Sequence, residues 1–265
     1  MRHAIEDVEY AEYLFDRFYG IGSCESGGVT RLGYTEVEDE MHRTLCELGK
    51  EKGYGNFADQ VGNTYLYRTQ YSKDEPYWLV GSHLDSVIEG GRYDGVAGII
   101  AGLLVMSWAE RDGLDLPIRV GAMRCEESSN FGRSTIGSGL ITKEIYKHDV
   151  GEAVNKQGET LHEVFDRKGY SLTPDRIKGI REYLELHIEQ GKVLEEYGDA
   201  VGHCEHHRRP APLRCTCTAT RSIPAPRPWA CAPTRLRRRP RSSWKLRRSA
   251  SPRPCTSPWP RWASS

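Results

Sequence analysis

The composition of the chain changes abruptly after Gly202, and this change constrains folding more than any other feature of the sequence. Residues 1–202 hold 22 basic and 36 acidic residues, whereas residues 203–265 hold 15 basic residues and a single acid, Glu205. The later segment also carries eleven of the 14 prolines and only four Leu or Ile residues. Because so few apolar residues cannot form a core, we expect residues 1–202 to fold and residues 203–265 to be an unstructured tail.

Three interpretations of residues 203–265 compete. The run RLRRRPR at residues 235–241 is typical of a basic nucleic-acid-binding tail, and a proline-rich polar segment is typical of a disordered linker. The third interpretation is translation of GC-rich DNA in a wrong frame, which yields mainly Arg, Pro, Ala, Ser, Cys and Trp. Degenerate codons for residues 214–236 permit another frame that contains His-Ser-Gly-Ala-Thr-Pro-Met. We favour the frameshift and expect no nucleic-acid partner.

Strand-like and helix-like segments alternate in residues 1–202. Apolar spacing predicts helices over 4–20 and 35–52, the second with Thr35 as N-cap and Glu38 in capping-box position. Residues 96–108 are apolar nearly all round, which predicts a buried helix. Strands are predicted over four ranges: 60–68, 77–81, 118–123 and 183–188. This alternation predicts an α/β fold with a largely parallel sheet.

Three of these strands end near His, Asp or Glu residues, and parallel strands bring their carboxyl ends to one edge of a sheet. In His83-Leu84-Asp85, one ring nitrogen of His83 could bind a metal while Asp85 holds the other nitrogen or its backbone surroundings. Glu126 and Glu127 follow the strand at 118–123, so one could bind a metal while the other accepts a proton. The plainer alternatives are a surface turn at His83 and an exposed acidic turn at the Glu pair.

Two further residues complete a donor set. Asp94, in GGRYDGVAG, could bridge two cations or simply cap the following helix. His187, in LELHIEQG between apolar neighbours, could be a ligand or a core histidine. Two His, one Asp and one Glu form a mixed nitrogen and oxygen set without thiolate, which suits catalytic zinc, manganese or cobalt better than a structural zinc. We therefore expect two divalent metal ions about 3.5 Å apart, bridged by Asp94.

The strings GSHLDS, GGRYDGVAG, the EE pair and LELHIEQG, in this order, resemble the di-metal amidohydrolases. This family includes N-carbamoyl-L-amino-acid hydrolase, allantoate amidohydrolase and β-ureidopropionase, within the aminopeptidase-like metallopeptidases. The resemblance covers residues 33–202 and implies an incomplete aminopeptidase-like di-zinc catalytic domain. It also implies a role for each motif residue: His83 and His187 bind one metal, Asp94 bridges, Glu127 binds the other metal, Glu126 is the general base, Asp85 orients His83, and Gln190 contacts the substrate.

The implied reaction is hydrolysis of a linear C–N amide bond in a small carbamoyl or ureido compound. One alternative is a dipeptidase or aminopeptidase of the same superfamily, against which Gln190 argues. Another is a non-catalytic protein with a basic nucleic-acid-binding tail. The His-Ser-Gly-Ala-Thr-Pro-Met frame resembles a segment of the family's lid domain, so we expect that this truncated chain is inactive and that a longer parent protein forms a homodimer.

The cysteine pattern and the N-terminus indicate the compartment. Residues 1–202 hold three cysteines without paired spacing, Cys24, Cys46 and Cys125, which favours a reducing environment over a disulfide framework. The first residues are polar rather than signal-like, and no apolar run approaches the roughly 18 residues of a membrane span. These features predict a cytoplasmic enzyme without membrane association.

Overall fold

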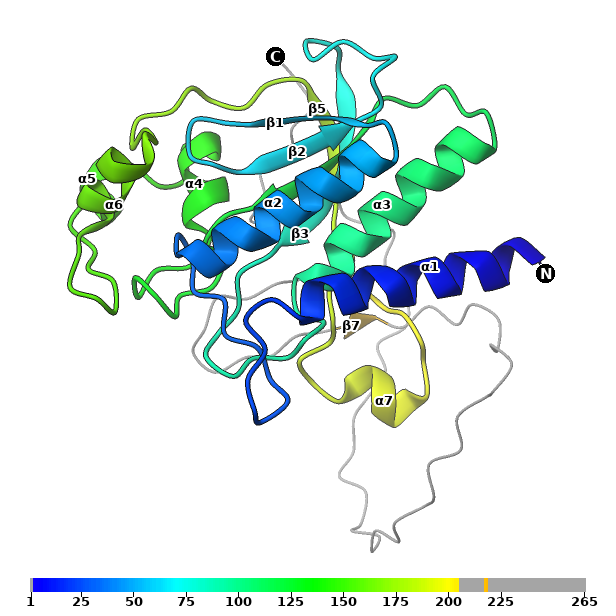
Figure 1. The fold of residues 1–265 in the computed structure, drawn as a ribbon, viewed down its shortest axis with the longest axis horizontal. Helices are drawn as coiled ribbons and strands as arrows, with labels where there is room; N and C mark the ends of the chain where they lie inside the picture. Colours follow the sequence, from blue (N-terminus) through cyan, green and yellow to red (C-terminus); the bar gives the residue numbers. More distant parts are fainter. Residues whose placement is uncertain (1, 205–216, 219–265) are drawn as a thin grey trace, which may run out of the picture. The chain divides into compact units, whose positions relative to one another are not determined.

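The computed structural model describes residues 2–204 and 217–218, with side chains for residues 5–202. The described residues form two compact units, the first running to Ile188 and the second beginning at Glu189. Figure 1 shows the elements of both units. The first unit carries the sheet and all but one of the predicted site residues.

A five-stranded sheet forms the centre of the first unit. Its strands are β1 (Gly55–Ala58), β2 (Thr64–Tyr67), β3 (Tyr77–His83), β4 (Ile118–Met123) and β5 (Ile180–Leu184), in the spatial order β1-β2-β4-β3-β5. β3 pairs in parallel with both β4 and β5, whereas β1 with β2 and β2 with β4 are antiparallel. The α/β class is confirmed, but the largely parallel sheet is correct only for β4-β3-β5.

The antiparallel part arises from a tight turn that the sequence pattern did not predict. The predicted strand at 60–68 begins only at Thr64, because the carboxylate of Asp59 accepts the backbone N–H groups of Val61 and Asn63 and thereby fixes a turn. Gly62 in this turn has φ +86°, which suits glycine. A connection this short can join only antiparallel strands, so β1 and β2 form a hairpin.

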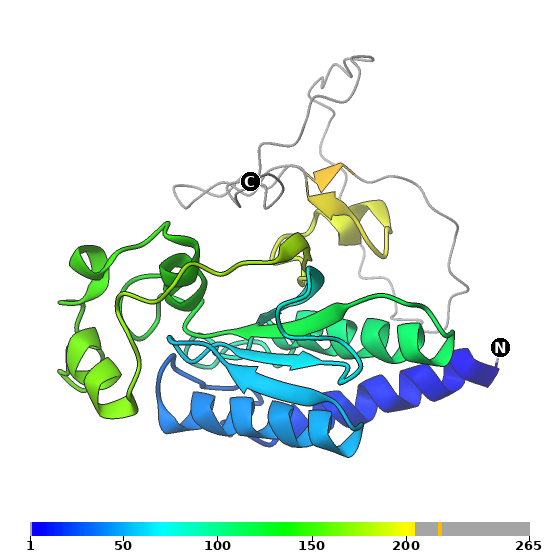
Figure 2. The same cartoon turned by 90° about the horizontal axis from the view of Figure 1, so that it is seen from above.

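Helices α1 (Arg2–Tyr19), α2 (Glu36–Glu51) and α3 (Val96–Arg111) cover one face of the sheet, as Figure 2 shows. The core on this face joins sheet residues such as Val80 and Val120 to helix residues such as Leu45 and Ile99. α3 contacts β3 and β4 and also α1, which explains why its sequence is apolar nearly all round. The predicted helices are confirmed with small shifts at their ends.

The opposite face of the sheet has a second core. Neighbouring strand residues alternate between the faces, so Leu79 joins this core while Val80 joins the first. Leu140 of α4 (Ile136–Thr142) and Phe165 of α6 (Leu161–Lys168) pack here, and the four-residue helix α5 (Lys147–Val150) lies between them in the sequence. The sheet is therefore buried on both faces, and its strand ends remain as the places where polar groups can gather.

The capping box predicted for α2 is wrong. Thr35 is the N-cap residue, but its hydroxyl donates to the Leu32 carbonyl at 2.7 Å and makes no capping hydrogen bond. The Glu38 carboxylate is buried and accepts the N–H groups of Tyr34 and Cys125 instead. The pattern indicated the helix start correctly, but it could not reveal that a distant loop competes for the same carboxylate.

The second unit contains α7 (Val193–Tyr197), whose first N–H groups are held by the Glu189 carboxylate at 2.8 and 2.9 Å. Two short strands, β6 (His203–Cys204) and β7 (Cys217–Thr218), pair antiparallel. They fall within the segment that we predicted to be unstructured, so that prediction does not hold for these four positions. Residues 205–216 and 219–265 lie outside the described residues, and the boundary predicted at residue 202 stays a prediction.

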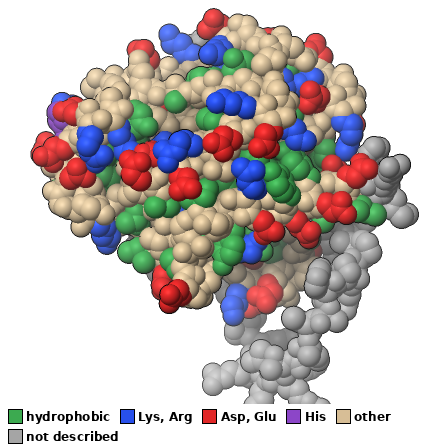
Figure 3. Space-filling model, viewed as in Figure 1, with side chains coloured by type: hydrophobic (Ala, Val, Ile, Leu, Met, Phe, Trp, Pro, Cys, Tyr) green, Lys and Arg blue, Asp and Glu red, His purple; other side chains and the backbone are tan. Residues whose placement is uncertain are grey.

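The described surface bears on two further predictions. Among the described helices, none is both long and apolar enough to cross a membrane. On the face drawn in Figure 3, acidic and basic side chains are interspersed with hydrophobic ones. This face presents no single block of basic charge, and the basic run at residues 235–241 lies outside the described residues.

Candidate metal centre

His83 is the last residue of β3, and the fold fixes its ring closely. Its side chain is 1% exposed, and its Nδ1 lies 3.0 Å from the backbone carbonyl oxygen of Asp85. Gly95 has φ +66°, and a Cβ there would come within 2.6 Å of the His83 ring. The Nε2 atom is buried and has no hydrogen-bond partner among the described residues. Burying such an atom without a partner is costly, which indicates a ligand at this position.

Asp85 connects the end of β3 to the loop after β4. Its buried carboxylate accepts the backbone N–H of Glu126 through Oδ1 and that of Glu127 through Oδ2, each at 3.0 Å. The Oδ1 atom also lies 3.4 Å from His83 Nδ1. The structure thus places Asp85 beside His83 and also shows that it holds both glutamates by their backbone; its orienting role stays a prediction.

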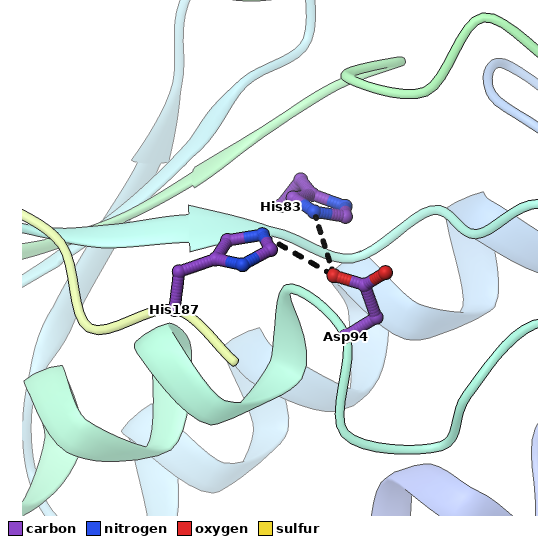
Figure 4. Close-up of side chains that lie close together, drawn as sticks. All are labelled: His83, Asp94 and His187. Carbon is purple, nitrogen blue, oxygen red and sulfur yellow. Dashed lines mark ion pairs between the residues drawn. The ribbon is translucent and has the colours of Figure 1, made fainter. Parts of the chain in front are cut away.

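Asp94 and His187 approach His83 from different segments, as Figure 4 shows. Asp94 Oδ1 lies 3.7 Å from His83 Nε2 and 3.2 Å from His187 Nε2. Gly95, not Asp94, is the N-cap residue of α3, so the N-cap alternative for Asp94 is wrong. The core-histidine alternative for His187 is also wrong, because its side chain is 34% exposed.

The three side chains of Figure 4 form one group whose ligand atoms lie within 4.8 Å of one another. Glu126 and Glu127 form a second such group, again with His83. In that group the Glu126 carboxylate approaches His83 Nε2 to 3.9 Å. The structure thus gathers five predicted residues around the end of β3. Gln190 belongs to the second unit, and its substrate contact stays a prediction.

Negative charge exceeds positive charge in this centre, because four carboxylates surround two histidines, and this balance shifts the pKa values of several residues. Burial lowers the pKa of His83, but the carboxylates of Asp85, Glu126 and Asp94 outweigh burial and raise this pKa to about 10. Burial and then the neighbouring Glu126 raise the pKa of Glu127 to about 7. Burial also raises the pKa of Glu126. A divalent cation would relieve this crowding of acids, so the donor set fits a metal.

Glu185 is a supporting residue that the sequence analysis did not single out. It follows β5, and its carboxylate accepts hydrogen bonds from Ser82 Oγ at 2.5 Å and from the Tyr183 hydroxyl at 2.9 Å. Tyr183 also donates to the Gly81 carbonyl at 3.2 Å. These bonds tie the end of β5, and with it the segment of His187, to β3. The motif LELHIEQG contains Glu185, but only the β3–β5 pairing reveals its partners.

Comparisons with known proteins agree with this geometry, although no family model matches the chain. The chain is 36% identical over 191 residues to an N-carbamoyl-L-amino acid amidohydrolase of Geobacillus stearothermophilus, covering 69% of this chain and 46% of the relative. It is 32% identical to an allantoate amidohydrolase of Bacillus subtilis, covering 74% and 48%. A hydantoinase/carbamoylase family amidase from Burkholderia ambifaria superposes with a TM-score of 0.64 at 30% identity, covering 72% and 47%.

The α/β fold and the donor groups gathered at the end of β3 fit the class of metal-dependent hydrolases. Over the matched residues, the chain belongs to the amidohydrolase family of the N-carbamoyl-amino-acid and allantoate amidohydrolases, as its motifs predict. It spans about half the length of the curated relatives it matches.

Proposed function

We propose that this chain carries the metal-binding half of an enzyme that hydrolyses a linear C–N amide bond in a carbamoyl or ureido compound. The observation that carries the proposal is the gathering of Asp94, His187, Glu126 and Glu127 around His83 at the end of β3. The similarity to amidohydrolases acting on N-carbamoyl-amino acids and allantoate supports the substrate class. An N-carbamoyl-amino acid and allantoate are the two substrates proposed.

We propose two divalent ions, zinc or else manganese or cobalt, held by His83, His187 and Glu127 with Asp94 between them. Two groups of possible ligand atoms support the proposal, one with Asp94 and His187 and one with Glu126 and Glu127, and His83 belongs to both. Such ions polarise a carbonyl and stabilise negative charge on its oxygen.

Glu126 is the residue proposed to move the proton. It follows β4 beside the centre, its carboxylate points toward His83, and its backbone N–H is held by Asp85. In the proposed reaction Glu126 accepts a proton from the attacking water and then donates it to the leaving nitrogen. Asp85 is proposed to hold His83 and Glu126 in position relative to each other. Gln190 is proposed to contact the substrate.

The frame of residues 203–265 decides which polypeptide is active. We propose that these residues are out of frame, supported by their composition, that the parent is a longer cytoplasmic homodimer, and that this chain lacks activity. Resequencing the gene across codons 195–265 should reveal a lost or gained base near codon 203. An unchanged sequence would remove the frameshift from the proposal.

The functional test compares the 265-residue chain with the frame-restored protein. Each is loaded with Zn²⁺, Mn²⁺ or Co²⁺ and assayed with an N-carbamoyl-amino acid, allantoate and a dipeptide. We expect the restored protein to hydrolyse the carbamoyl or ureido compound, and its Glu126→Gln variant to lose at least about 100-fold in rate, as for loss of a general base. Exclusive hydrolysis of the dipeptide would instead favour the peptidase alternative.

A further inference from the structure

Glu38 lies in the first turn of α2, yet its carboxylate accepts hydrogen bonds from the loop after β4. The side chain is fully buried. Oε1 accepts the backbone N–H of Cys125 at 2.8 Å, and Oε2 accepts the N–H of Tyr34 at 2.6 Å. Oε2 also accepts from Arg124 Nη1 at 2.9 Å. Both carboxylate oxygens are therefore used, and two of the three donors are backbone groups of separate segments.

Both of these backbone segments adopt an unfavourable conformation. Tyr34 has φ +60° and Cys125 has φ +49°, in the left-handed region that residues with a Cβ seldom occupy. Such conformations persist when surrounding contacts over-determine them, and they cluster at functional sites. The two segments also touch closely, because a Cβ on Gly33 would lie 2.4 Å from the Cys125 sulfur. Glu38 is thus the charged group that joins two left-handed turns.

The loop after β4 is held residue by residue. Glu38 accepts the N–H of Cys125, and Asp85 accepts the N–H groups of Glu126 and Glu127. Three consecutive backbone N–H groups therefore point to two buried carboxylates from different parts of the chain. The left-handed turn at Cys125 sets the direction in which the chain enters the glutamate pair, so the bond from Glu38 acts on the same loop as the bonds from Asp85.

We infer that Glu38 is a positioning residue for the metal centre: its carboxylate fixes the left-handed turn at Cys125 and so sets the placement of Glu126 and Glu127. The inference rests on the proposed function only for the roles of those two glutamates. Its structural part, that Glu38 holds the loop, stands on the hydrogen bonds to Tyr34 and Cys125. A carboxylate that merely balanced the charge of Arg124 would have no such effect.

Asp39 provides the matched control for that distinction. It is the next residue of α2, and its Oδ1 accepts from the same Arg124 Nη1 at 2.5 Å, while Oδ2 pairs with Lys168. Replacing Asp39 with Asn removes a negative charge from Arg124 and leaves the bond from Glu38 to Cys125 in place. Comparing Glu38→Gln with Asp39→Asn therefore separates backbone positioning from charge balance.

The experiment measures amide hydrogen exchange in the full 265-residue chain, without metal, followed by Co²⁺ titration. We expect Glu38→Gln to speed exchange of the Cys125–Glu127 amides at least about 10-fold and to weaken Co²⁺ binding by about 10-fold or more, the usual range for residues that support ligands. Asp39→Asn should leave both quantities within about twofold of wild type. If Glu38→Gln fails to fold, Glu38→Asp takes its place, because its shorter side chain cannot span Tyr34 and Cys125.

The two readouts keep the inference separate from the proposed function. Unchanged exchange at Cys125–Glu127 in the Glu38 variant, or equal changes in the Asp39 variant, would overturn the positioning role. If the wild-type chain does not bind Co²⁺, the proposed function is contradicted. Hydrogen exchange of the Cys125–Glu127 amides would still test whether Glu38 holds the loop. Faster exchange confined to the loop, together with weaker Co²⁺ binding, supports both.

Discussion

The metal centre has two sides that are built differently. On the side of β3 and β4, His83 and Asp85 are buried, and the glutamate loop is bonded through its backbone. On the side of β5, His187 lies three residues beyond the strand end and is partly exposed. Among the described strands, β5 lies at the edge of the sheet and pairs with β3 alone. The first side is set by the packed sheet, whereas the second depends on a short segment held by a few hydrogen bonds.

This difference predicts how much each side contributes to metal affinity. Preorganised ligands bind with less loss of conformational freedom, so the β3–β4 side should supply most of the affinity. His187 then completes a site that already exists. Substitutions on the two sides can test this division, and those on the buried side should have the larger effects on stability and metal binding.

Gly95→Ala should have the largest effect. The new Cβ would lie 2.5 Å from the His83 carbonyl oxygen and 2.6 Å from its ring, at a residue with φ +66°. Left-handed strain and overpacking together should lower the free energy of unfolding by about 2–5 kcal/mol, and Co²⁺ binding should be lost. Urea unfolding of the chain measures the first quantity. Gly91→Ala in the same loop is the control, because its Cβ meets nothing within 4 Å.

Asp85→Asn should follow in size. Asn offers one carboxamide oxygen where the carboxylate accepts two backbone N–H groups. Loss of a charge-assisted bond, with an N–H left facing an amide donor, should lower the free energy of unfolding by about 2–3 kcal/mol. Weaker Co²⁺ binding, by about 10–100-fold, should accompany it in a calorimetric titration. Wild-type affinity in this variant would show that the two glutamates need no backbone anchor.

The same contrast between the two sides explains what the sequence could reveal. His83, Asp94 and Glu126 lie at or beside the ends of elements with clear apolar patterns, so their convergence could be predicted from the rule that parallel strands bring their carboxyl ends to one edge of a sheet. The segment around His187 was predicted as strand to residue 188, but β5 ends at Leu184. An edge strand packs less of its surface, so its apolar pattern is weaker and its end is harder to place.

Long-range hydrogen bonds were beyond sequence reasoning for a different reason. Glu38 has the spacing of a local helix cap, and its actual partner Cys125 lies 87 positions away in the chain. No periodicity encodes such a pairing, because it depends on how the first turn of α2 meets the loop after β4 in the folded chain. The β1–β2 hairpin was missed because the capping of its turn by Asp59 is also a side-chain effect.

Tyr183→Phe should have a smaller effect on the β5 side. It removes the hydroxyl that donates to Glu185 and to the Gly81 carbonyl, which should cost about 1 kcal/mol of stability. The end of β5 should loosen, so Co²⁺ affinity should fall only a few-fold. Hydrogen exchange in the β5 peptide, compared with the β4 peptide, measures this directly. Equal loosening of both strands would contradict the division into two sides.

His187→Ala should have the smallest effect on stability and a clear effect on metal binding. Its ring is partly exposed, and its Nε2 lies 3.2 Å from Asp94 Oδ1, so the free energy of unfolding should change by less than about 0.5 kcal/mol, as for surface substitutions. Co²⁺ affinity should fall, because one of the nitrogen donors is lost, yet binding through His83 and the carboxylates should persist. The matched variant His83→Ala should abolish binding, since both ligand groups contain His83. If His187→Ala abolishes Co²⁺ binding while His83→Ala only weakens it, the β5 side supplies most of the metal affinity and the β3–β4 side supplies less.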